Sequence, residues 1–328
     1  MSLTMMRRRL ATAAVIASVG FVTVRSAFAN HGPGTSGGGS STISGETLAE
    51  GKLDLSLRTD YTKFESVSRD GAERRAAEAG GFDALDSAFI TTVGASYGIF
   101  NDFQISASIG YYAGNNFIDA EVDEDTGETE SAVSDPQGLT DLTISAKYRL
   151  LHGEPGNLSV IGGVIFPTGR DDVKLSSGEA LEPSSQPGTG EWGFQIGTAY
   201  SRFLTSRITV DASALYTTRL EKGDFKVGDR VDLGVALAYR LTESIKAFPN
   251  YSVFAEITGV WIGKDEDAGE TNPNSGGWTA YLTPGGRVRF SPQWSLTVAP
   301  SFPIYQDLNG EQIESRFKLA ATLSFSFD

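Results

Sequence analysis

The chain contains no cysteine and only two histidines among its 328 residues. The absence of cysteine excludes disulfides, thiolate metal sites and a catalytic thiol. His31 lies near the N-terminus and His152 in a predicted turn, so no histidine sits at the outer end of a predicted strand. An outer-membrane hydrolase or protease would need one there as a base. We therefore predict no enzyme, and no cofactor.

Positive charge is also scarce, with 27 Lys and Arg against 41 Asp and Glu and a net charge of -14. A nucleic-acid partner needs basic surface to contact phosphates, so this class of partner is excluded. After the first thirty residues, no apolar run approaches the roughly 20 residues of a transmembrane helix. A membrane-crossing strand shows lipid only every second residue, so this absence does not exclude a membrane protein.

The first 29 residues have the features of a secretory signal peptide. Residues 7–9 are three arginines, residues 10–24 are mostly apolar, and residues 27–29 form a small-x-small cleavage site. We predict that residues 1–29 are removed and that residues 30–48, rich in Gly, Ser and Thr, form a flexible lead-in. Residues 49–328 then form the folded domain.

Strict alternation of apolar and polar residues runs through that domain, and it is clearest in residues 317–327. There the odd-numbered residues are Phe, Leu, Ala, Leu, Phe and Phe, whereas Lys, Thr and Ser occur among the even-numbered ones. A strand alternates its faces at every residue, so one face is wholly apolar. Phe325 and Phe327 end this face, and we predict that they form the signal read by the barrel assembly machinery. Asp328 follows Phe327, whereas the usual signal ends on an aromatic residue.

The same pattern predicts twelve strands joined alternately by short turns and by long polar loops. Aromatic residues gather at both strand ends, as they do where a barrel meets the two membrane interfaces. The chain is therefore predicted to be all-β, a transmembrane antiparallel up-and-down β-barrel of about 12 strands in the bacterial outer membrane, surrounded by lipid and lipopolysaccharide. A soluble sandwich would not explain the two aromatic girdles. The predicted strands are 50–61, 86–99, 103–113, 139–150, 158–168, 191–201, 207–219, 230–240, 251–263, 278–290, 294–305 and 317–327.

Charged residues on the strands should point into the lumen, because charge facing lipid is costly. They either pair across the barrel and fill it, or they line a pathway, and a barrel of about twelve strands allows both. Three aromatic residues share this inward phase and predict an apolar patch. Prolines 167, 284, 300 and 303 lie inside strand patterns and predict bulges or kinks. The predicted pathway residues are Arg230, Arg240, Glu256, Arg287, Arg289, Lys318, Phe254, Tyr281 and Tyr305.

Two acidic loops share a near-repeat, DEDTGET at residues 123–129 and DEDAGET at residues 265–271. Acids spaced around a Gly turn can supply oxygen ligands to a divalent cation. Asp123, Asp125, Asp265 and Asp267 are therefore weak candidate metal ligands. The alternative is two solvated acidic turns.

Three short motifs resemble a family of proteobacterial outer-membrane barrels. They are HGPGTSGGG at residues 31–39 leading into SGETL at 44–48, PTG at 167–169, and PIYQDLNG at 303–310. The family is labelled as transporters of a "putative MetA-pathway of phenol degradation". The resemblance implies uptake of small molecules, aromatic ones among them, and supplies no site residues.

These observations favour a passive, porin-like channel for small, aromatic or anionic solutes. Two alternatives stay open. One is a closed structural or adhesion barrel that acts through its acidic loops, and the other is an outer-membrane enzyme, disfavoured by the missing histidine.

Overall fold

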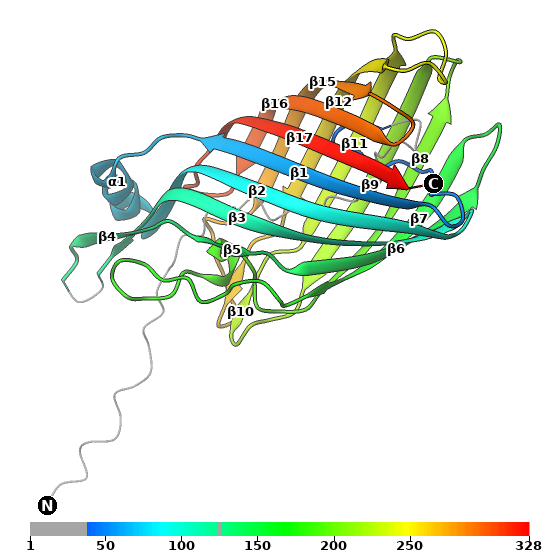
Figure 1. The fold of residues 1–328 in the computed structure, drawn as a ribbon. Coiled ribbons are helices and arrows are strands. Elements are labelled where there is room, and N and C mark those ends of the chain that lie inside the picture. The colour runs from blue at the N-terminus through cyan, green and yellow to red at the C-terminus, as the bar shows by residue number, and fades with distance from the viewer. Residues whose placement is uncertain (1–37, 124–125, 328) are drawn as a thin grey trace, which may run out of the picture.

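The computed structural model describes residues 38–123 and 126–327, so the predicted signal peptide lies outside the described residues. Twelve antiparallel strands close into a barrel, because β2 pairs with β1 on one side and with β3 on the other (Figure 1). The barrel strands are β1 (Leu53–Phe64), β2 (Gly81–Phe100), β3 (Phe103–Val122), β6 (Leu142–Leu151), β7 (Asn157–Phe166), β8 (Gly193–Phe203), β9 (Ile208–Arg219), β11 (Arg230–Arg240), β12 (Asn250–Ile262), β15 (Gly277–Arg289), β16 (Trp294–Leu308) and β17 (Ser315–Phe327). The predicted fold class is confirmed.

Short turns join the strands at one end of the barrel and longer segments join them at the other. We call these the short-turn end and the long-loop end. The first strand begins and the last strand ends at the short-turn end, where Leu53 pairs with Phe327. The longer segments carry β4 (Thr129–Ser134), β5 (Gln137–Leu139), β10 (Phe225–Lys226), β13 (Glu266–Asp267), β14 (Glu270–Thr271), a 3-10 helix (Pro183–Ser185) and α1 (Arg69–Ala79).

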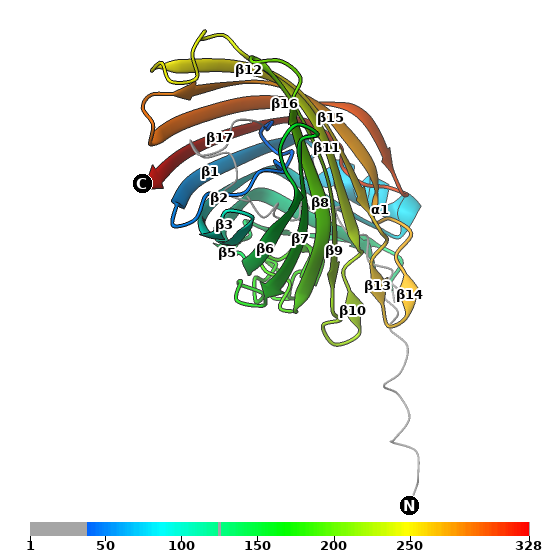
Figure 2. The same ribbon diagram turned by 90° about the vertical axis from the view of Figure 1, so that its right-hand side faces the viewer.

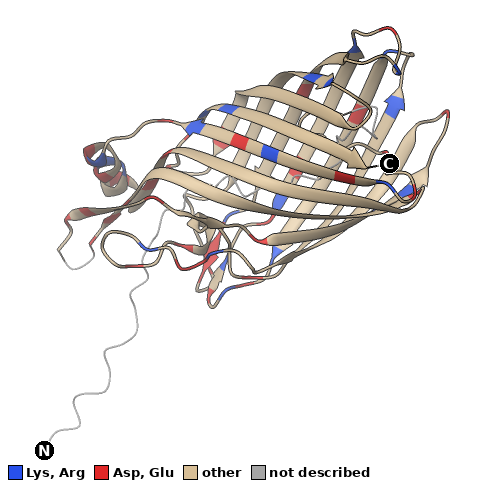
Figure 3. Cartoon of the chain, viewed as in Figure 1, with Lys and Arg blue, Asp and Glu red and all other residues tan. Residues whose placement is uncertain are grey.

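The apolar strand face points outward. On β11, Leu233, Val235 and Leu237 are 41%, 55% and 50% exposed, whereas Ala236 between them is 1% exposed. Aromatic pairs mark both ends of this face. The rings of Trp294 and Phe325 lie 4.6 Å apart at the short-turn end, and those of Trp261 and Trp278 lie 6.5 Å apart toward the long loops. Charged residues lie on the strands as well as at the barrel ends (Figure 3).

Two strands extend well beyond the predicted limits. β2 and β3 remain paired as far as Gly81 and Glu121, and α1 packs against this extension at the long-loop end (Figure 2). The sequence pattern did not predict this helix because it is short and polar. Ser68 caps its N-terminus, Gly80 in the left-handed region ends it, and Ala72 and Ala76 are its buried residues.

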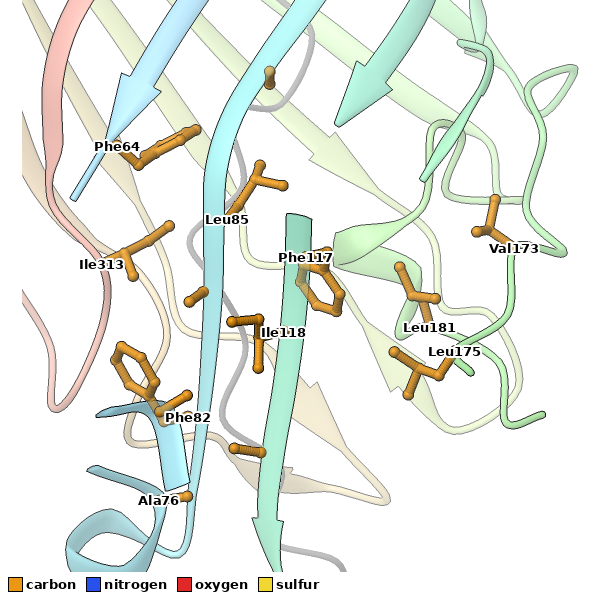
Figure 4. Close-up of a cluster of buried hydrophobic side chains, with 14 of the residues drawn as sticks. Phe64, Ala76, Phe82, Leu85, Phe117, Ile118, Val173, Leu175, Leu181 and Ile313 are labelled. Atoms are coloured by element: carbon orange, nitrogen blue, oxygen red, sulfur yellow. The ribbon is translucent and has the colours of Figure 1, made fainter. Parts of the chain in front are cut away.

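The largest apolar cluster of buried residues lies at the long-loop end. It joins α1 and the β2–β3 extension to residues of the loops that follow β7 and β16 (Figure 4). Phe82, Leu85 and Phe117 are each 1% exposed or less. This packing fixes the long-loop end, while the lumen nearer the short turns is lined by polar side chains. Among the described residues, no helix is long and apolar enough to span a membrane.

We expect Phe327→Ala to lower the yield of folded barrel several-fold, because Phe327 ends the outward aromatic face and packs edge-on against Phe325 with ring centroids 4.5 Å apart. The measurement is the fraction that migrates differently before and after boiling on a gel. The matched control is Thr322→Ala on the inward face of the same strand. Ser326 is unsuitable, because its hydroxyl donates to the buried carboxylate of Asp54. Equal yields for the two variants would contradict this role of Phe327.

Candidate functional site

The inward face of the barrel is lined largely by small hydroxyl residues. Small side chains cannot fill a twelve-stranded barrel by themselves, unlike the side chains that fill an eight-stranded one. Their burial therefore shows that something else occupies the lumen. The inward hydroxyl residues that are less than 9% exposed include Ser56, Thr62, Thr92, Ser96, Thr143, Ser145, Ser159, Ser201, Thr209, Thr258, Thr283, Ser295, Thr297 and Ser324.

Residues 38–48 occupy it, and we call them the lumen segment. Most of them are buried, and Thr42 and Ser44 have no exposed surface. The segment contacts β3 at one end, where the Leu48 N–H donates to the Gln104 side chain, and β9 at the other, where the Gly38 N–H donates to Asp211. The prediction of a flexible lead-in is therefore wrong for residues 38–48. Small polar residues fit a narrow, charged lumen and are held there.

Two carboxylates bind the N–H groups of the segment. Glu256 of β12 accepts hydrogen bonds from the backbone of Ser40, Ser41 and Thr42, and also from the Thr42 hydroxyl at 2.6 Å. Asp211 of β9 accepts from the Gly38 N–H at 2.6 Å and from the Ser201 hydroxyl. Such charge-assisted bonds are the stronger kind of hydrogen bond. Glu256 is 1% exposed and Asp211 is fully buried.

Cationic side chains bind the carbonyl groups of the same segment. Arg58 of β1 donates to the Ser40 carbonyl at 2.5 Å. Arg287 of β15 donates to the Gly38 and Gly39 carbonyls at 3.2 Å each. Lys147 of β6 donates to the carbonyls of Ser44 and Glu46. Five inward charges of the barrel thus bind a backbone that has no strand beside it.

Glycine allows the closest approach between segment and wall. A Cβ atom at Gly45 would lie 2.3 Å from the Asn157 carbonyl oxygen and 2.8 Å from the Ser201 nitrogen, both of which are strand backbone. On the wall, a Cβ atom at Gly234 would lie 2.6 Å from the Thr42 hydroxyl. Neither position admits a larger residue while the segment is seated.

A small cavity lies on each side of the segment along the barrel. The outer cavity, toward the long loops, is about 40 Å³ and is lined by residues that include Arg58, Tyr281 and Lys318. The inner cavity, at the short-turn end, is about 30 Å³ and its lining includes Arg240 and Arg287. Both are far below the roughly 150 Å³ of a cavity that admits benzene. A solute of that size would not fit in either cavity.

The structure brings several of the predicted pathway residues to these cavities. Arg289 lines the inner cavity beside Arg240 and Arg287. The Lys318 ammonium lies 3.8 Å from the centre of the Tyr281 ring at the outer cavity. Arg230 faces inward and forms a two-point ion pair with Asp232, with distances of 2.6 and 2.7 Å.

Of the predicted pathway aromatic residues, Phe254 faces the lumen and Tyr305 faces outward. Phe254 is 6% exposed and packs over Gly285, where a Cβ atom would lie 2.2 Å from its ring. Tyr305 does not face the lumen: it is 55% exposed and pairs with Ala280 on the outward face. Pro303 pairs with Tyr281, so Ile304 is an extra residue that shifts the register and reverses the phase of Tyr305.

The acidic near-repeats take separate local roles. Asp123 accepts from the Thr126 N–H and hydroxyl within its own turn, and Asp265 accepts from the Gly228 N–H at 2.6 Å. Burial raises the pKa of Glu182 well above its usual value, and the nearby carboxylates of Asp265, Asp119 and Asp267 add to the shift. Asp125 lies outside the described residues. In residues 38–123 and 126–327, no group of three or more His, Asp or Glu side chains could hold a metal ion.

The strand pattern predicts the inward charges but does not predict that the lumen segment binds them. Asp211, Arg58 and Lys147 follow from strand phase, because each lies on an inward position of an alternating strand. The lumen segment has no alternation and no long apolar residues apart from Ile43 and Leu48. Its only signal is a run of Gly, Ser and Thr next to a barrel whose inward residues are too small to fill it.

Comparisons with known proteins agree with this architecture. The structure is similar to the COG4313 outer membrane channel from Pseudomonas putida F1, with a TM-score of 0.57, 13% identity, and coverage of 86% of this chain and 97% of that one. The NanC porin matches with a TM-score of 0.46 and 11% identity, over 83% of this chain and 98% of the porin. LpxR from Salmonella typhimurium matches with a TM-score of 0.42 and 11% identity, over 84% of this chain and 98% of LpxR.

No match is found among curated proteins. The sequence matches one family over residues 32–302, which is most of the chain and includes the lumen segment. The twelve-stranded barrel places the protein in the bacterial outer membrane. The chain belongs to the family described as "Putative MetA-pathway of phenol degradation".

Proposed function

We propose that the protein is a passive outer-membrane channel for small molecules and that the lumen segment is its removable plug. The observation that carries this proposal is that the barrel wall does not fill the lumen by itself. The wall contributes small residues, and residues 38–48 contribute the filling. The strand ladder closes without the segment, because β1 pairs with both β17 and β2. Displacing the segment would leave a closed wall around an open lumen.

The contacts of the segment support its release. Most are hydrogen bonds to side chains, and each contributes only about 0.5–1.5 kcal/mol net, or about 1.5–3 kcal/mol where a charge takes part. Water entering the lumen can replace such partners. Ile43 and Leu48 are the only large apolar residues that the segment buries, at 7% and 1% exposed. A permanently filled core would instead be mostly apolar.

Small aromatic or anionic solutes fit this channel best. Arginines line the inner cavity of an otherwise acidic chain, and rings of charge of one sign select ions of the other. Tyr281 and Phe254 offer aromatic surface along the same lumen. The family description refers to phenol degradation, which agrees with small aromatic molecules.

A closed structural barrel is the second candidate, and the filled lumen favours it. An enzyme is less favoured, because the one histidine in the described part of the chain, His152, lies exposed in a short turn away from both cavities. Conductance separates the channel from the closed barrel.

We expect Gly45→Val to raise single-channel conductance in planar bilayers several-fold over the wild type. The added side chain would clash with strand backbone and unseat the segment. The matched control is Gly162→Ala on β7, where a Cβ atom has nothing within 4 Å, and it should conduct like the wild type. A folded Gly45→Val barrel that carries no more current than the control would favour the closed barrel.

A tether provides a reversible version of this test. The Ser44 and Ser201 hydroxyl oxygens lie 2.9 Å apart, close enough for a disulfide after Ser44→Cys with Ser201→Cys. The native chain has no cysteine, so this pair is unique. We expect oxidation to abolish current and a reductant to restore it. Current that is the same in both redox states would show that solutes do not need the segment to move. The single variant Ser44→Cys controls for effects of the reductant.

We expect Glu256→Gln to loosen the segment without unfolding the barrel. The N–H groups of Ser40, Ser41 and Thr42 would lose a charged acceptor, and amide exchange in residues 38–48 should speed up by about tenfold or more. Mass spectrometry of exchanged peptides measures this, and β-strand peptides are the internal reference. An unchanged rate in the segment would exclude Glu256 as its anchor.

A further inference from the structure

Three arginines converge where the lumen meets the short-turn end. Arg240 of β11 pairs with Ser252 of β12, and Ser252 pairs with Arg287 of β15, so the two arginines flank one residue across neighbouring strands. Adjacent strands lie about 4.8 Å apart, which puts the two backbones about 10 Å apart. Arg289 follows two positions along the same face, opposite Asn250. All three line the inner cavity.

The positive charge of this cluster is only partly compensated. Arg240 donates to the carbonyls of Thr242 and Ser206. Arg289 stacks over the Phe248 ring at 5.4 Å, and its Nε is buried without a hydrogen-bond partner among the described residues. Within residues 38–123 and 126–327, neither of these arginines forms an ion pair with a carboxylate. The nearest inward acids, Asp211 and Glu256, bind the lumen segment.

We propose that this cluster is a binding site for small carboxylate anions. A guanidinium presents two parallel N–H groups that match a carboxylate. Phe203, Ile245 and Ala238 line the same cavity and would offer apolar surface to the body of an aromatic acid once displacement of the lumen segment has enlarged the cavity. The inference rests on the proposed channel function and names the chemical class of its solute.

The same site is coupled to the lumen segment through Arg287. This residue lines the inner cavity and also donates to the Gly38 and Gly39 carbonyls. A carboxylate bound in the cavity competes with these carbonyls for one guanidinium. An anion that binds better when the segment is displaced shifts the barrel toward the open state. The solute thus helps to open its own path.

Binding is tested with benzoate as the probe, by calorimetry on the full mature chain folded in detergent. Benzoate should bind, benzyl alcohol should not, and Arg289→Gln or Arg240→Gln should weaken benzoate binding by about tenfold or more. The matched control Arg316→Gln lies at the other end of the barrel and is exposed, with Glu314 as its partner at 3.3 Å, so it should bind normally. Equal affinity in all variants would overturn the site, and phosphate binding as tightly as benzoate would overturn its selectivity for carboxylates.

Coupling is tested by amide exchange in the same samples. Benzoate at a concentration that saturates the wild type but not Arg289→Gln should speed exchange in residues 38–48 of the wild type and leave the variant nearly unchanged, because the variant binds benzoate more weakly while Arg287 is intact. Benzoate that binds without changing exchange would overturn the coupling. Neither measurement needs ion flow, so a barrel that never conducts can still bind benzoate. Failure of the channel function and failure of this site are therefore distinguishable.

Discussion

The structure depends on satisfying the backbone polar groups of an extended segment that has no neighbouring strand. A buried N–H or C=O group without a partner costs free energy comparable to a lost hydrogen bond. In the barrel wall the ladder removes this cost. In the lumen the cost is removed by side chains: Glu256 and Asp211 accept from N–H groups, and Arg58, Arg287 and Lys147 donate to carbonyls.

This constraint explains the charges on the inward face. An ion in a narrow lumen loses part of its hydration, and it needs either an opposite charge or several hydrogen bonds. Arg230 takes the first solution with Asp232. Glu256 takes the second, with three backbone donors and one hydroxyl donor from the lumen segment. On our proposal, the same inward charges serve in two states of the barrel. They bind the backbone of the lumen segment in the closed state, and they bind water or solute in the open state.

Much of the barrel could be predicted because strand periodicity is local. The alternation within each strand shows which of its residues face the lumen. Arg287, Glu256 and Tyr281 could therefore be placed inward without knowledge of the neighbouring strands. The alternation fails where one residue is inserted, and the bulge at Ile304 turns Tyr305 outward. Pro303 predicted an irregularity in this strand but not which residues would change face.

The lumen segment and α1 could not be predicted, for different reasons. Several partners of the segment lie more than 100 residues away in the sequence, such as Asp211 for Gly38, and nothing in the segment's own pattern identifies those partners. The helix is defined by its caps and by two small buried alanines. These features are too few to predict a helix in a segment of such polar composition.

The two ends of the barrel differ in the side chains that they carry. The long-loop end is packed with apolar residues such as Phe82, Leu85 and Phe117, whereas the short-turn end carries Arg240 and Arg289 beside phenyl and aliphatic surface. A neutral apolar molecule gains little from the arginines, and a small hydrophilic anion gains little from the aromatic surface. A solute that combines a ring with a carboxylate interacts favourably with both. On our proposal, recognition of that combination is coupled to the closure of the barrel, because Arg287 also holds the lumen segment.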